Sequence, residues 1–222
     1  MIQIPKGGSD HICRVTVILA LVVLITATFL VACWSVPLLQ LTSIPRDQIP
    51  QPVLDIGDSF IPEGKTLADI GLVWRACERN GDRLLVACTF FRMGDKNQPV
   101  LSVSSWPLDE SGKVAAFDEH IVVMDFNDRV NRLVGARHGT AVAKDGSTTT
   151  QLSAGGLCRD TRVTKIVGTT SSGRSVQTTP VNGFWYLFID GLATTEKWTK
   201  ISGLDAKDKP IVDLTPSPQE GL

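Results

Sequence analysis

Hydrophobic and polar residues are distributed unevenly along the chain, and the first forty positions hold its longest apolar run. Residues 15–34, VTVILALVVLITATFLVACW, contain no charged side chain and are almost wholly aliphatic. At a rise of about 1.5 Å per residue, a helix of this length spans roughly the 30 Å hydrocarbon core of a bilayer. Lys6, His11 and Arg14 precede the run, and positive charge on the short leading side keeps that side in the cytoplasm. The pattern predicts a short cytoplasmic N-terminus (1–14), a single transmembrane helix (15–34) and an outward-facing remainder, periplasmic or extracellular, held at the cell membrane.

The end of the apolar run allows a second interpretation. Leu30-Val31-Ala32-Cys33 resembles the lipobox of bacterial lipoproteins, in which small residues precede a cysteine that is acylated through its sulfur. The resemblance covers these four positions and the basic and apolar regions before them, and it implies cleavage before Cys33 and lipidation of its thiol. The run is longer than the roughly 7–15 apolar residues of a typical signal peptide, and Trp34 suits the interfacial belt of an intact helix. An uncleaved signal-anchor and a lipoprotein therefore both remain open, and both tether the rest of the chain to a membrane.

The apolar run is followed by a change in composition. Residues 35–52 hold four prolines and show little periodicity. Because proline fixes φ and removes a backbone donor, this stretch is predicted to be an extended spacer between the membrane and the outer domain. The outer domain is predicted to cover residues 53–214, and the polar tail 215–222 is predicted to be disordered.

Short alternating segments separated by turn residues occupy the outer domain. Strands are expected at 99–106, 120–126, 130–138, 161–170, 174–181 and 183–191, with one or two more within 196–214. The segments 120–126 and 130–138 are expected to form a hairpin around a polar turn at 127–129. The stretch 142–156 has the weakest pattern and is predicted to be a long surface loop. Short strands at this spacing, in a composition rich in β-branched residues, predict an all-β fold of the antiparallel sandwich or barrel type.

The segment 74–88 has two interpretations. Asn80-Gly81 between two strand-like runs is a strong signal for a hairpin, and centring the turn there pairs Arg79 with Asp82. Alternatively, Thr66 and Asp69 resemble the start of a capped helix whose apolar positions recur at helical spacing up to residue 77. The hairpin is preferred, and one short helix is kept as the alternative.

Aromatic side chains supply the candidates for an interaction surface. The segment 184–189, FWYLFI, is apolar on both faces of a strand, which predicts a central strand rather than an edge. Trp185 and Tyr186 in this segment would form a recognition patch, together with Trp106 and Trp198, only if they were exposed.

Three cysteines lie in the outer domain, where oxidation is available: Cys77, Cys88 and Cys158. In the hairpin register Cys77 faces Leu84 and Cys88 faces Val73, which separates the two thiols by ~13 Å and prevents a bridge. The helix interpretation permits a bridge between Cys77 and Cys88, and Cys158 is a candidate partner for either. Buried unpaired thiols are the remaining alternative.

The residues that carry chemistry do not form a recognisable catalytic pattern. The formal net charge of −1 argues against nucleic-acid binding, which needs a basic surface. His120 and His138 supply at most half a zinc site, and no nucleophile elbow, phosphate loop or calcium loop occurs. We therefore expect no catalytic residues, metal or cofactor. The expected function is that of a non-enzymatic structural or protein-interaction module of the cell envelope, with binding of a small envelope ligand, a glycan or a peptide, as the alternative. The oligomeric state is left open.

Overall fold

The computed structural model describes residues 38–59, 63–66, 68–92, 95–115, 119–123, 126, 130–142, 148–193 and 195–216. The chain divides into two units, Met1–Pro37 and Leu38–Leu222, and every described residue lies in the second. The predictions for the cytoplasmic N-terminus, the membrane segment, the lipobox and residues 217–222 of the tail fall outside the described residues. Within the described part of the chain, no helix is long and apolar enough to cross a membrane.

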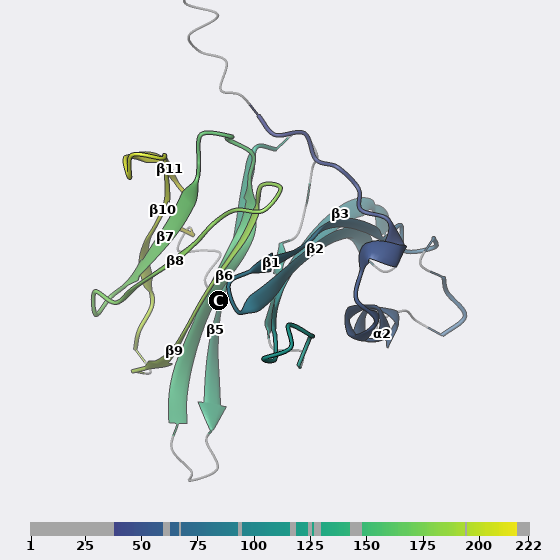
Figure 1. Cartoon of the computed structure of the whole chain (residues 1–222), viewed down its shortest axis with the longest axis horizontal. Coiled ribbons are helices and arrows are strands. Elements are labelled where there is room, and N and C mark those ends of the chain that lie inside the picture. Colours follow the sequence, from purple (N-terminus) through teal and green to yellow (C-terminus); the bar gives the residue numbers. More distant parts are fainter. Residues whose placement is uncertain are drawn as a thin grey trace, which may run out of the picture. The chain divides into compact units, whose positions relative to one another are not determined.

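The described unit is built almost entirely from antiparallel strands, which confirms the all-β prediction (Figure 1). Two short helical elements precede the strands, the 3-10 turn η1 (Arg46–Gln48) and α2 (Gln51–Ser59). The strands are β1 (Val73–Asn80), β2 (Arg83–Arg92), β3 (Asp95–Pro107), β4 (Glu119–Val123), β5 (Arg132–Val142), β6 (Thr148–Cys158), β7 (Lys165–Thr170), β8 (Ser175–Thr178), β9 (Phe184–Leu192), β10 (Trp198–Leu204) and β11 (Pro210–Asp213). They form a first sheet of order β1-β2-β3-β4, a middle sheet of order β5-β6-β9 and a third sheet of order β11-β10-β7-β8.

The first hairpin forms as predicted, but its register is displaced. Asn80 pairs with Arg83, so the two-residue loop is Gly81-Asp82 rather than Asn80-Gly81. Gly81 has a φ of 68°, and glycine adopts this left-handed conformation without steric cost. The capped turn of the alternative interpretation also exists, because the Thr66 amide and hydroxyl both donate to the Asp69 carboxylate at 2.7 and 2.8 Å. It ends after a single turn, and β1 follows.

Two predictions about the middle of the chain are wrong. β4 pairs with β3 in the first sheet and β5 pairs with β6 in the middle sheet, so the segments expected as a second hairpin belong to different sheets. Residues 148–156, which make up most of the expected loop, belong to β6 (Thr148–Cys158), the central strand of the middle sheet. Positions 152–158 are all buried. The small side chains of β6 weaken its alternating pattern. They also allow the first and third sheets to pack closely against its two faces.

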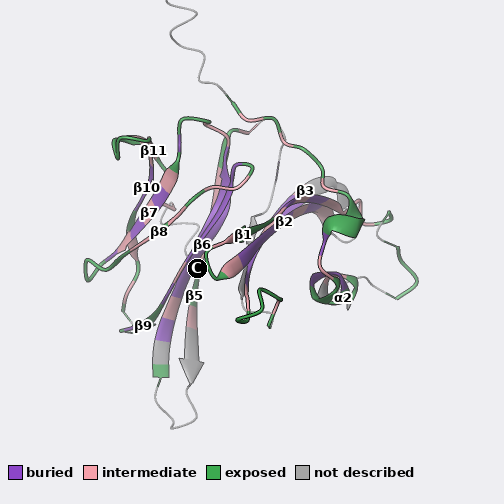
Figure 2. Cartoon of the chain, viewed as in Figure 1, coloured by how far each residue is buried: buried purple, intermediate pink, exposed green. Residues whose placement is uncertain are grey.

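Two cores enclose the middle sheet, one on each face. Alternate residues of β9 point in opposite directions, so Phe184 and Tyr186 pack against the first sheet, whereas Trp185 and Leu187 pack against the third sheet. Figure 2 shows the buried segments following β6 and the strands β2 and β3. β9 is thus buried on both faces, as its composition predicts. It is nevertheless the last described strand of its sheet. The prediction that this strand is buried on both faces is correct, but the prediction that it lies between two neighbouring strands is wrong.

Residues 38–52 pack onto the domain instead of forming the predicted extended spacer. The Leu39 amide donates to the Arg159 carbonyl at 2.7 Å, and the Arg159 Nε donates back to the Leu39 carbonyl at 2.5 Å. Ile49 is 5% exposed and joins Val53 of α2 in a third core on the outer face of the first sheet. The apolar residues between the prolines drive this packing because they cover strand residues such as Trp74 that would otherwise face water.

This packing predicts where a soluble fragment should begin. A fragment that starts at Leu38 is expected to be more stable than one that starts at Gln51, by about 2 kcal/mol or more. The shorter fragment loses the burial of Ile49 and the two hydrogen bonds between Leu39 and Arg159. Urea denaturation of the two fragments measures the difference, and equal midpoints would show that residues 38–50 contribute nothing to the fold.

Candidate functional site

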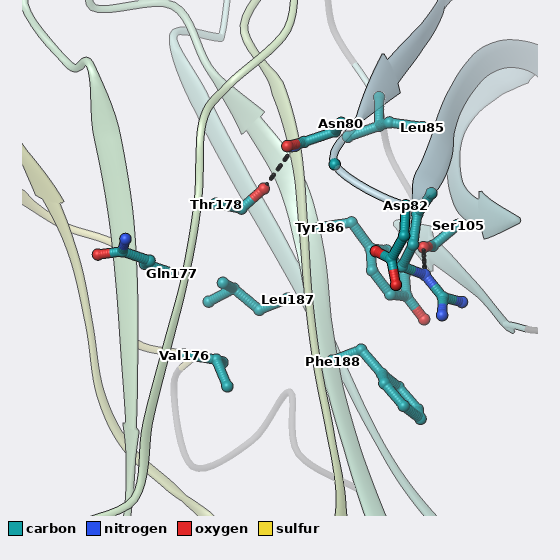
Figure 3. A pocket seen from close by; sticks show the side chains of 12 residues that line it. Asn80, Asp82, Leu85, Ser105, Val176, Gln177, Thr178, Tyr186, Leu187 and Phe188 are labelled. Atoms are coloured by element: carbon teal, nitrogen blue, oxygen red, sulfur yellow. Dashed lines mark hydrogen bonds between the residues drawn. The ribbon is translucent and has the colours of Figure 1, made fainter. Parts of the chain in front are cut away.

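A cavity of about 280 Å³ lies where the three sheets meet (Figure 3). Its walls are residues 80–83 at the β1–β2 turn, residues 176–178 of β8 and residues 186–188 of β9, together with Leu85 and Ser105. Consecutive side chains of a strand point to opposite faces of the sheet. A cavity that touches three consecutive residues therefore lies beside the edge of the strand and not on one face. β8 and β9 are both outermost described strands of their sheets. The cavity is therefore a slot between two strand edges.

Arg83 forms one end of this slot. Its Nε donates to the Ser105 hydroxyl at 2.5 Å, and its guanidinium carbon lies 5.5 Å from the centre of the Phe188 ring. A cation over an aromatic face is attracted by the ring quadrupole, which helps to hold the side chain in place. Arg83 is half-buried, whereas its neighbour Asp82 is exposed. The slot therefore contains one positive and one negative side chain.

Amide side chains join the β1–β2 turn to β8 and to the segment after it. The Asn80 side-chain amide donates to the Thr178 hydroxyl at 2.7 Å and to the Thr179 carbonyl at 3.1 Å (Figure 3). The Asn182 amide donates to the Glu78 carboxylate at 3.0 Å. The Asn80 contact connects the first and third sheets, and the Asn182 contact connects β1 to the turn before β9.

The lining of the slot is as apolar as it is polar, and its polar groups are able to form hydrogen bonds. Its side chains include one guanidinium, one carboxylate, two amides and three hydroxyls. The wall also contains backbone from two strand edges, which supplies further donors and acceptors. Such an arrangement can orient a bound molecule by hydrogen bonds and by one charge.

The four aromatic residues proposed from sequence are not brought together. Trp106 is 3% exposed in the core beneath α2, and its Nε1 donates to the Ser104 hydroxyl at 2.8 Å. Trp185 is fully buried between the middle and third sheets, and Trp198 is half-buried at the border of the same core. Tyr186 alone of the four lines the slot, and it is 7% exposed.

Sequence reasoning missed the other residues of the slot. The sequence pattern predicts a role for Asp82 only as a turn residue and for residues 176–178 only as part of a strand, and it gives no binding role to Arg83. No local signal marks them as a site, because three separate sheets must assemble before they face one another. The one local feature that indicates a site is the set of charged residues on both sides of Gly81 in the first hairpin.

The three described cysteines are free thiols. Cys77 faces Val86 and Cys88 faces Trp74, each displaced from the predicted partner by the shifted hairpin register and by an irregularity near Trp74. Both thiols lie on the face of the first sheet that packs against α2. Cys158 is buried at the end of β6, away from that face.

Burial changes the acidity of these thiols. It raises the pKa of Cys88 to about 12, and burial with the nearby Glu78 charge raises the pKa of Cys77 to about 11, from about 9 in each case. A raised pKa means that the folded state keeps a proton that the unfolded state loses. The resulting stabilisation is complete below pH 9 and is lost as the pH rises from 9 toward 11 for Cys77 and toward 12 for Cys88.

We therefore expect the unfolding midpoint to fall between pH 9 and 11 more steeply in the wild-type domain than in a Cys77→Ala/Cys88→Ala double variant. Thermal unfolding followed by circular dichroism under reducing conditions measures both slopes. Between pH 6 and 8 the two proteins should change in parallel, which serves as the control. Identical slopes above pH 9 would show that these thiols ionise equally in both states.

His120 and His138 lie in different sheets, opposite Ser104 and Leu152 respectively. Among the residues that the structure describes, no group of three or more His, Cys, Asp or Glu side chains is placed to hold a metal ion.

Comparisons of the chain with protein-family models, with curated proteins and with solved structures found no match.

Proposed function

We propose that the chain is a membrane-tethered, non-enzymatic interaction module of the cell envelope. Residues 15–34 serve as an uncleaved anchor, or an acylated Cys33 replaces them, and the β domain is displayed outside the cytoplasm. There it binds a partner protein.

One observation carries the interaction role: a slot with polar and apolar walls that is bounded by two strand edges. Both faces of the middle sheet are covered by other sheets, and α2 covers part of the outer face of the first sheet. Strand edges are the parts of a β protein that most readily accept another chain, because their backbone groups can continue a ladder of hydrogen bonds. The slot combines such edges with fixed polar side chains.

The size of the slot favours a second candidate. A cavity of about 280 Å³ is close to the lower limit of typical small-molecule sites. A domain that binds a small envelope ligand, a peptide or a glycan, is therefore the alternative.

The tether is tested by mass spectrometry of the full chain purified from membranes. Recovery of peptides from residues 1–14 is the result expected for an uncleaved anchor, and a diacylated N-terminal Cys33 is the result expected for a lipoprotein. A mature chain that begins elsewhere and carries no lipid would overturn the tether.

The interaction is tested by lysine-directed chemical cross-linking in intact cells that express the full chain. A chain that ends after Pro37 is the matched control, since it keeps the predicted tether and lacks the domain. We expect the full chain to form a discrete cross-linked species with an envelope protein, absent from the control. Failure to capture any protein through the domain would contradict the interaction role.

A further inference from the structure

We infer that the end of the domain around Leu38 lies against the phospholipid headgroups of the membrane to which the chain is tethered. This inference rests on the proposed tether and adds to it a surface of the domain and the partner of that surface. It applies to the uncleaved anchor and to the lipoprotein alike. It follows from where the chain joins the domain, from the length of chain before that point and from the side chains around it.

The chain joins the domain at Leu38. Leu38 forms an antiparallel bridge with Asp160, in the loop between β6 and β7. The next residue, Leu39, exchanges two hydrogen bonds with Arg159 of the same loop, at 2.7 and 2.5 Å. Residues held by such bonds are part of the domain and do not act as a spacer. Of the spacer predicted at 35–52, only residues 35–37 are left to separate the domain from the apolar run.

These three residues allow little distance from the bilayer. A fully extended chain covers at most about 3.6 Å per residue, so Leu38 lies no more than roughly 14 Å from Trp34 along the chain, or about 18 Å from an acylated Cys33. The headgroup layer of each leaflet is itself about 5–7 Å thick. For the uncleaved anchor, the gap beyond the headgroups is then at most about 8 Å. The Leu38 end is therefore the part of the domain that meets the headgroups.

The β10–β11 turn lies at the same end of the domain. Lys165, the first residue of β7, follows the loop that binds Leu38, and its Nζ lies 2.6 Å from the carboxylate of Asp208 in the turn. Figure 1 shows the entering chain, the loop between β6 and β7 and the β10–β11 turn at one end of the described unit. Lys207 and Lys209 of this turn are thus on the same side as Leu38.

The side chains at this end suit a headgroup layer. Among the residues that the structure describes, Leu38 is the one large hydrophobic side chain that is exposed, at 42%. Lys207 and Lys209 are exposed, and their side chains make no hydrogen bond or ion pair with another described residue. Ammonium groups bind phosphate oxygens, and an apolar side chain inserts at the boundary between headgroups and acyl chains.

The neighbouring carboxylates are engaged within the domain. Asp160 binds Arg162 and Asp208 binds Lys165, each at 2.6 Å. The carboxylate of Asp205 accepts from two backbone amides of its own turn at 2.8 and 3.0 Å. The charges left to meet a phosphate layer are therefore the ammonium groups of the turn. Phosphate is common to zwitterionic and anionic phospholipids, so either kind supplies the partner.

The test is lipid cross-linking of the full chain reconstituted in phosphatidylcholine vesicles. The photoreactive residue p-benzoylphenylalanine replaces Lys207, and lipid adducts are measured by mass spectrometry. Thr195 is the matched control position, because it is an exposed turn residue at the opposite end of β10, about 23 Å away along the strand. Because the headgroup layer is shallow, we expect roughly tenfold more lipid adduct at position 207 than at position 195.

A longer connection tests the cause of the contact. Inserting about ten Gly and Ser residues between Pro37 and Leu38 adds up to roughly 36 Å of reach and should reduce the lipid adduct at position 207 severalfold. The same residues added after Leu222 are the control and should leave the adduct unchanged. An equal adduct with and without the inserted spacer would overturn the inference, because the short connection would then not hold this end at the lipid.

The remaining outcomes separate this contact from the tether. Equal lipid adducts at positions 207 and 195 overturn the contact. If mass spectrometry of the mature chain still finds residues 1–14 or an acylated Cys33, the tether stands and only the contact is lost. In intact cells, a discrete protein adduct at position 207 without any lipid adduct would assign this end to the partner protein, which also overturns the inference.

Discussion

Replacing Trp185 with alanine is expected to lower the free energy of unfolding of the domain by about 3–5 kcal/mol. Trp185 is fully buried in the core between the middle and third sheets, beside Ile166 and Ile201. Truncating a buried aromatic side chain removes its transfer free energy and leaves a cavity that a closely packed core fills only in part. The loss is comparable to the entire stability of a small domain. Urea denaturation of the fragment that begins at Leu38 measures it.

Trp185→Phe is the matched control for this variant. Among the described residues, the Trp185 Nε1 is buried without a hydrogen-bond partner, so the substitution removes an unsatisfied donor as well as ring volume. We expect Phe to cost clearly less than Ala. If the alanine variant kept the wild-type midpoint but lost partner binding, Trp185 would belong to a recognition surface and not to the core.

The second large effect is expected at Gly156 in β6. A Cβ at this position would lie 2.0 Å from the carbonyl oxygen of Leu133 in the paired strand β5, far inside van der Waals contact. Because the obstacle is backbone, β5 and β6 must separate to accommodate even a methyl group. Gly156→Ala should therefore destabilise the domain by about 3 kcal/mol, at the upper end of the cost of overpacking.

Gly139→Ala provides the control within the same pair of strands. An added Cβ at Gly139 meets nothing within 4 Å, and Gly139 pairs with Gln151 of β6. Alanine lowers the conformational entropy of the unfolded chain, so this variant should be neutral or more stable by up to about 1 kcal/mol. Urea denaturation of the two variants separates the clash from the general effect of replacing glycine. Equal stabilities would show that β5 moves away from Gly156 at little cost.

Most strands could be predicted because their signals are local. Alternation and turn residues identified the segments of β3, β7, β8, β9 and β10, and glycine identified the first hairpin. The same reasoning failed for β6, whose Ala154, Gly155 and Gly156 carry too little side chain to produce an apolar alternation. Asp145-Gly146, just before β6, is itself a sequence signal for a hairpin turn.

Pairing between strands was harder to predict than their existence. Residues 119–142 contain two strand patterns separated by a polar turn, which normally indicates a hairpin. In the structure β4 pairs with β3 and β5 pairs with β6, so the two segments enter different sheets. Nothing in the local pattern distinguishes a turn within a sheet from a crossing between sheets.

The sequence by itself determined that the chain outside its apolar N-terminal run forms short antiparallel strands, and that the strand 184–189 is buried on both faces. Side-chain hydrophobicity and turn chemistry are local properties, and they act before distant segments meet. Only the tertiary structure decided that β9 is the last described strand of its sheet, that residues 38–52 pack onto the domain and that Arg83, Gln177 and Phe188 line one slot. These features depend on which layers stack and in which register. The stacking and the register depend on the total packing energy of the three sheets. No short stretch of residues determines that energy.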